Sequence, residues 1–226
     1  MRLVGLYFFL LTIMSCPAIA NESSTREVKM PVFSKSGNIY YTQARGHTIT
    51  VTHSGKDSDP VLSLDKKLIA FARIGDRVIP KGCEGNTETK YGNQIWIYNI
   101  LTKNERLLVA NNFQCNNPEK QIIDPNVLTF SPDAKILYFL TYAWTTSNAL
   151  HGVNIDGSHQ HYIAPANSLE VISKGTYKGY FIVNEHRYFI PPGGTYDWYW
   201  LVSPNGKDEG PLGEEITNEQ RNFLES

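Results

Sequence analysis

The sequence predicts an all-β protein assembled from repeated four-stranded antiparallel sheets, and three observations lead to this fold class. The chain has 13 Tyr, 10 Phe and 4 Trp, together with 17 Gly and 12 Pro, and this composition is typical of sheets joined by many turns. One residue pattern occurs twice, at 63–71 and 131–139. Each copy is followed by further apolar stretches and polar turns, as a repeating unit requires.

The two copies share Ser, Asp and Lys at matching positions, followed by an apolar run that ends in Phe. Residues 63–71 read SLDKKLIAF and residues 131–139 read SPDAKILYF. A Ser or Asp side chain at this position can bond its own backbone, so the motif predicts a tight turn that leads directly into a buried strand. Weaker copies stand at 34–41 and 174–183.

Further apolar stretches complete each unit. They lie at 94–100 and 106–109, at 150–155 and 161–163, and at 198–202. Each unit therefore supplies about four strands, which is the content of one β-propeller blade. A propeller of six or seven blades, at about 40 to 45 residues per blade, needs a longer chain. We expect a small or incomplete propeller of three to four blades in a single domain over 21–226, with a short helix within 214–224.

Residues 1–20 have the features of a secretory signal peptide. Arg2 is followed by an apolar run over 3–14, and Ala18-Ile19-Ala20 forms a small-residue cleavage site. The run is shorter than the roughly 20 apolar residues that span a bilayer. We therefore expect a soluble periplasmic or secreted protein, cleaved after this site; the alternative is lipid attachment at Cys16.

Export bears on the two cysteines that remain after cleavage, Cys83 and Cys115. Thiols oxidise outside the cytoplasm, so we expect these two residues to form a disulfide bond. The formal net charge is −1, with acidic and basic residues mixed along the chain. Without a basic stripe, nucleic acid and anionic membrane are not expected partners.

The sequence lacks the motifs of common catalytic and cofactor sites. It has no Gly-x-Ser-x-Gly elbow, no His-Glu-x-x-His pair, no phosphate-binding glycine loop and no EF-hand loop. We therefore expect no catalytic residues, no metal and no cofactor. His159 and His161 alternate and could share a strand face with a third metal ligand, but we expect a solvated turn. His186 is expected to be a structural histidine in a polar network and not a general base.

The run at 131–139, with the strand and Asp-Gly turn after it, resembles the WD40-like repeats of TolB-type periplasmic β-propellers. The resemblance extends over about three units between residues 32 and 213, and it implies a scaffold that binds envelope proteins. The separate α/β domain that those scaffolds usually carry is missing from this sequence. The chain is also similar to small, incomplete-propeller immunity proteins against type VI secreted peptidoglycan amidases. There a loop of small hydroxyl residues plugs the toxin's catalytic cleft, a role that would fall on Ser147 with Thr145 and Thr146.

Two segments stand out as recognition loops. Residues 142–149 interrupt a blade where a tight turn would suffice, and residues 190–200 place aromatic side chains around a Pro-Gly hinge. Tyr and Trp are enriched at binding hot spots because they bury a large area at small entropic cost. The alternative is that Trp144, Trp198 and Trp200 fill the gaps between blades. The expected partner-binding residues are Trp144, Thr145, Thr146, Ser147, Asn148, Tyr196 and Asp197.

These observations favour a non-enzymatic protein that binds another protein. The most specific expectation is an immunity protein, an inhibitor that plugs the active site of a secreted peptidoglycan-degrading effector. One alternative is a TolB-like envelope scaffold. Another is a carbohydrate-binding or enzymatic propeller that uses the aromatic loop as a stacking platform.

Overall fold

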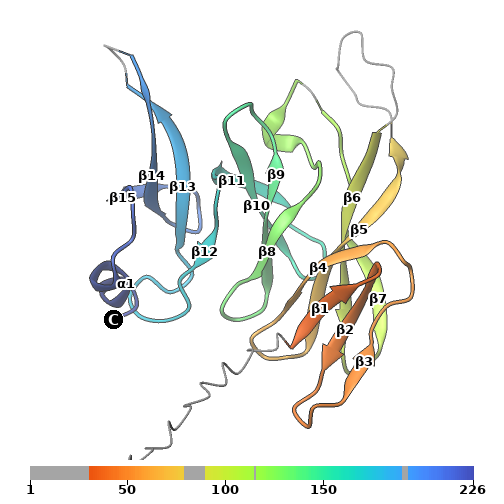
Figure 1. The fold of residues 1–226 in the computed structure, drawn as a ribbon. Coiled ribbons are helices and arrows are strands. Elements are labelled where there is room, and N and C mark those ends of the chain that lie inside the picture. Colours follow the sequence, from red (N-terminus) through yellow and green to blue (C-terminus); the bar gives the residue numbers. More distant parts are fainter. Residues whose placement is uncertain (1–30, 79–89, 115, 190–192) are drawn as a thin grey trace, which may run out of the picture.

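The computed structural model describes residues 31–78, 90–114, 116–189 and 193–226. The expected signal peptide, Cys16 and the expected disulfide between Cys83 and Cys115 lie outside these residues, so they stay predictions. In the described residues the strands form four antiparallel sheets, each a simple up-and-down succession of neighbouring strands (Figure 1). No helix in these ranges is long and apolar enough to cross a membrane.

The sheets follow one another along the chain. The first sheet contains β1 (Val32–Lys35), β2 (Asn38–Thr42) and β3 (Thr48–Thr50). The second contains β4 (Asp57–Leu62), β5 (Leu68–Val78), β6 (Lys90–Asn99) and β7 (Asn104–Val109). The third contains β8 (Asn126–Phe130), β9 (Ile136–Tyr142), β10 (Asn148–Asn154) and β11 (His161–Pro165). The fourth contains β12 (Glu170–Val171), β13 (Phe181–Tyr188), β14 (Thr195–Val202) and β15 (Asp208–Gly213).

The sequence repeat coincides with the sheet repeat. In the turn between β4 and β5, the Ser63 hydroxyl donates to Asp65 Oδ1 over 2.6 Å and accepts the Leu68 amide over 3.0 Å. In the turn between β8 and β9, Ser131 makes the same two bonds, to Asp133 over 2.7 Å and from Ile136 over 3.0 Å. The two copies therefore occupy equivalent places. The weaker copies, 34–41 and 174–183, likewise connect the first strand of a sheet to its second.

The apolar faces of consecutive sheets pack on one another, which produces three layers of core. The first and second sheets enclose a cluster that includes Ile39, Tyr41, Ile69 and Phe71. The second and third sheets share a cluster that includes Ile95, Ile97, Phe130 and Phe139. The third and fourth sheets share a cluster that includes Leu140, Leu150, Phe181 and Val183.

The four sheets form an open fan. Among the described residues, each sheet packs through a shared core cluster against the next sheet along the chain. Figure 1 shows the fourth sheet at one end of the row and the first and second sheets at the other. The expected small, incomplete propeller is confirmed, with four blades of which the first has three strands.

A short helix covers the outer face of the fourth sheet (Figure 1). Helix α1 (Asn218–Leu224) buries Leu224 against Ile172, Ile182 and Leu201. The sequence predicted a helix anywhere within 214–224, and the structure begins it at 218. The reason is local, because the Thr217 side chain and the residue at the third helical position cap each other's backbone amides.

Candidate partner-binding surface

Both predicted recognition loops lie on the same side of the molecule, where strands of the third and fourth sheets turn back. Residues 143–147 connect β9 to β10, and residues 189–194 connect β13 to β14. Each is the link between the second and third strands of its sheet, so the two hairpins point the same way in neighbouring sheets (top of Figure 1). Residues 190–192 of the second loop lie outside the described residues.

The β9–β10 loop is held in shape by a residue that sequence reasoning missed. Asn167, in the link between the third and fourth sheets, accepts the Asn148 amide over 3.0 Å and donates to the Thr146 carbonyl over 2.9 Å. Within the loop, the Trp144 amide donates to the Ser147 carbonyl over 2.9 Å. Nothing in the sequence around Asn167 indicates this role, because its bonds reach 19 and 21 residues back along the chain.

The Trp144 side chain lies on the surface and not in a gap between blades. Its ring meets Tyr162 of β11 edge to face, with 6.1 Å between ring centroids. Trp200 behaves differently, since it packs against the core shared by the third and fourth sheets. The alternative that these tryptophans fill the spaces between blades therefore holds for Trp200 and not for Trp144.

A hollow of about 530 Å³ separates the two hairpins. One wall is the β9–β10 loop, and the other contains His186 and Tyr188 of β13. The Thr146 and Tyr188 hydroxyl groups meet across it at 3.3 Å. Thr145 and Thr146 are exposed on the loop, whereas Ser147 is half-buried in the wall of the hollow.

His186, in the wall of the hollow, forms a polar pair with Asp197. His186 Nδ1 lies 2.9 Å from Asp197 Oδ1, and the imidazole ring meets Tyr188 edge to face with centroids 5.0 Å apart. Asp197 is an acidic partner that can orient the imidazole ring, and this pairing fits both a structural histidine and a general base, so the expected structural role of His186 stays a prediction. No serine, threonine or cysteine of the described residues hydrogen-bonds to His186, so the pair has no nucleophile in place.

A separate polar cluster lies on the opposite face of β13. Arg187 binds Glu185 and Asp208 over 2.6 Å each, and its guanidinium stacks on the Trp200 ring at 3.5 Å. Burial raises the pKa of the Glu185 carboxyl, and the hydrogen bond from Arg187 opposes that rise. The Arg187–Asp208 ion pair connects β13 to β15, two strands away in the same sheet.

An aromatic row follows the β13–β14 hairpin. Phe189 lies 4.8 Å from Tyr196, and Tyr196 lies 5.2 Å from Trp198, measured between ring centroids. Tyr196, one of the predicted contact residues, is therefore half-buried within this row. Asp197 is exposed and turned toward His186.

The remaining histidine pair lies away from both hairpins. His159 stands in the turn between β10 and β11 with a positive φ of 54°, and its Nδ1 lies 3.1 Å from Nδ2 of the Asn154 side chain. His161 Nδ1 lies 2.8 Å from the His159 carbonyl oxygen. Both rings are engaged within their own turn. Across the described residues, no group of three His, Cys, Asp or Glu side chains is placed to hold a metal ion.

The fold and its exposed hairpins define this chain as an incomplete β-propeller. No protein-family model matches the sequence, and no curated protein matches it significantly. Among solved structures, dipeptidyl peptidase 4 of Porphyromonas gingivalis matches with a TM-score of 0.53 and 14% identity, over 81% of this chain and 31% of that one. The β-propeller domain of the Trilobed protease from Pyrococcus furiosus, described as having an open velcro topology, matches with a TM-score of 0.50 and 14% identity, over 82% of this chain and 54% of that one.

These two matches confirm the propeller fold, and at such identities they show the fold alone. The chain spans about a third of the peptidase and about half of the protease domain. TolB from Acinetobacter baumannii also matches, with a TM-score of 0.30 and 11% identity, over 76% of this chain and 50% of that one. That similarity is too low to bear on function, so the TolB-type and immunity-protein relationships stay expectations from the sequence.

Proposed function

We propose that this protein binds another protein through the hairpin surface, defined as residues 142–148 together with 186–189 and 194–197. The observation that carries the proposal is the exposure of large aromatic side chains on both hairpins. The exposed fractions are 56% for Tyr142, 39% for Trp144, 59% for Tyr188 and 53% for Phe189. Aromatic side chains gathered around a hollow on the surface are the usual anchors of a protein interface.

The rigidity of the β9–β10 loop supports this proposal. Asn167 and the bond within the loop fix its shape before any partner arrives. A preformed loop loses little conformational entropy when it binds, so more of the contact energy appears as affinity.

We propose further that the partner is a secreted peptidoglycan-degrading enzyme and that the β9–β10 loop enters its catalytic cleft. Thr145 and Thr146 are small, exposed and carried on a narrow hairpin, so they suit a cleft built for a polar polymer. Ser147 is half-buried, so it supports the loop from behind while the two threonines make contact. This proposal places the protein in the periplasm or outside the cell.

The test compares two threonine substitutions. Thr145→Arg enlarges the tip of the loop, and Thr50→Arg makes the same change at the exposed last residue of β3, in the first sheet. Wild-type protein on a resin first captures partners from envelope extract, and each captured protein is then purified for titration. We expect Thr145→Arg to weaken binding at least about tenfold and Thr50→Arg to leave it unchanged. Equal binding by both variants would remove the hairpin surface from the proposal.

The inhibitor role has a separate readout. Wild-type protein at equimolar concentration should stop the captured enzyme from clearing a peptidoglycan suspension, and Thr145→Arg should not. A partner that binds but has no hydrolytic activity would instead indicate an envelope scaffold of the TolB kind.

The aromatic row favours one second candidate, a carbohydrate-binding surface. Phe189, Tyr196 and Trp198 present consecutive rings on which sugar faces could stack. A saccharide array probed with the pure protein decides this point. Binding that is lost in Trp198→Ala and kept in Thr145→Arg would favour the sugar surface over the protein interface.

A further inference from the structure

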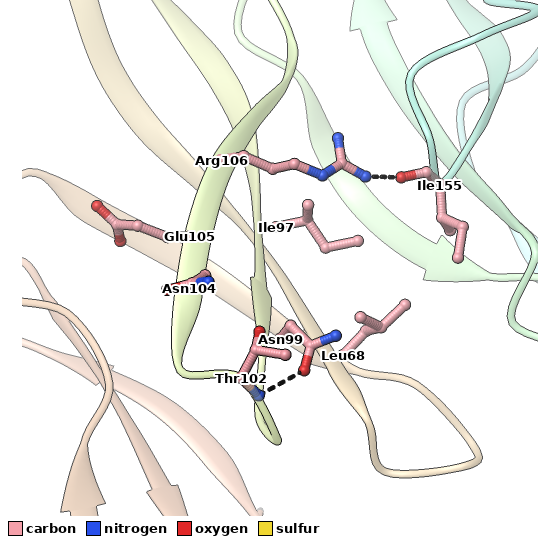
Figure 2. Close-up of a pocket in the computed structure, with 8 residues that line it drawn as sticks. All are labelled: Leu68, Ile97, Asn99, Thr102, Asn104, Glu105, Arg106 and Ile155. Carbon is pink, nitrogen blue, oxygen red and sulfur yellow. Dashed lines mark hydrogen bonds between the residues drawn. The ribbon is translucent and has the colours of Figure 1, made fainter.

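A second hollow lies between the second and third sheets. It is at the opposite end of the strands from the hairpin surface. It has a volume of about 290 Å³ and is lined by residues of β5, β6, the β6–β7 turn and β7, and by Ile155, which follows β10 (Figure 2). Leu68, Ile97 and Ile155 point into the same space and form its apolar floor (Figure 2). The hollow has room for about one amino-acid residue, since it is at the lower limit of known ligand pockets.

A cation lies across this apolar floor. Arg106 extends from β7 toward the third sheet and donates one N–H to the Ile155 carbonyl (Figure 2). Several guanidinium N–H groups remain, because arginine has more donors than this bond uses. No carboxylate of the described residues lies within ion-pair distance of Arg106.

The neighbouring acidic residue does not neutralise this cation. Glu105 points away from the hollow (Figure 2), and both of its carboxylate oxygens accept bonds from Arg73, over 2.9 and 3.0 Å. Asn99 adds a further donor. Its Oδ1 is occupied by the amides of Leu101 and Thr102, over 3.0 Å each, so its NH₂ group is left to face the hollow.

The hollow therefore combines an apolar floor with N–H donors that carry a net positive charge. An apolar group attached to a carboxylate complements both features, because arginine binds carboxylates through paired charge-assisted hydrogen bonds. We infer that this hollow binds the C-terminal residue of a peptide, with an aliphatic side chain on Leu68, Ile97 and Ile155 and the carboxylate on Arg106. The site is independent of the hairpin surface and of the partner proposed for it.

The experiment uses wild-type protein and two short peptides, acetyl-Ala-Ala-Leu with a free carboxylate and the same peptide with a C-terminal amide. NMR titration should show the free acid binding at least about tenfold more tightly than the amide, because the amide loses the charge-assisted bonds. The shifted signals should belong to Ile97, Ile155 and their neighbours. Equal binding of acid and amide, or no binding of either, would overturn the inference.

Two substitutions locate the site on the protein. Arg106→Gln should weaken binding of the free acid about tenfold, whereas Arg45→Gln, at an exposed turn of the first sheet, should have no effect. Thermal unfolding without peptide checks that both variants are folded. Since the comparison of acid with amide needs no substitution, it stands even if Arg106→Gln is unstable. A small aliphatic acid that binds as tightly as the peptide would show that the hollow takes free carboxylates instead of chain ends.

Discussion

A buried histidine should make the stability of this protein depend on pH. His151 of β10 is 1% exposed, lies flat against Phe139 with 5.4 Å between ring centroids, and has no hydrogen-bond partner at Nε2. Burial lowers its pKa from 6.5 to about 4. The folded state therefore favours the neutral ring, and the stability this provides is present above pH 6.5 and lost as the pH falls toward 4. A shift of this size corresponds to about 3 kcal/mol.

Urea unfolding at pH 7 and pH 4 measures this effect directly. His151→Phe keeps a flat ring against Phe139 and cannot titrate. Between pH 7 and pH 4, its free energy of unfolding should therefore fall by about 3 kcal/mol less than that of the wild type. His53→Phe is the control, because His53 is exposed, and it should follow the wild type. Equal losses of unfolding free energy between pH 7 and pH 4 in His151→Phe and the wild type would refute the reasoning.

Two further predictions concern stability. Gly206→Ala should destabilise the protein by about 2 to 4 kcal/mol, because φ is +82° and the new methyl carbon would lie 2.2 Å from the Ile163 carbonyl oxygen. Gly55→Ala, which also has a positive φ but open space around it, should cost only about 1 kcal/mol; equal losses would contradict the clash. Arg73→Met should cost about 3 to 5 kcal/mol, because it leaves the Asp57 carboxylate buried without its cation. Adding Asp57→Ala should recover part of this loss in thermal unfolding.

The sheet repeat could be predicted from the sequence because its cause is local. The Ser63 and Ser131 hydroxyls bond groups within five residues of themselves, so the same letters give the same turn. The Ser203 hydroxyl likewise accepts a backbone amide, that of Lys207, in a turn that joins the third and fourth strands of a sheet. The pattern therefore identifies the type of turn, and the length of the chain limits the number of sheets.

The hairpin surface and the second hollow depend on contacts between residues that are far apart in the sequence. They could therefore be predicted only in part. The β9–β10 loop was recognised from its composition, but its shape depends on Asn167 in a later segment. The pairing of His186 with Asp197 follows from the register of β13 on β14, which no local signal fixes. The hollow beneath Arg106 exists because two sheets meet there, and its lining comes from four separate stretches of chain.

Helix α1 covers the outer face of the last sheet in the row. Stacked sheets can in principle continue from one molecule to the next, and such head-to-tail contacts produce filaments. On the fourth sheet, Leu224 occupies the apolar patch of Ile172, Ile182 and Leu201 on which another blade would sit. The helix therefore covers apolar surface that the fourth sheet would otherwise expose, as terminal caps do in repeat proteins.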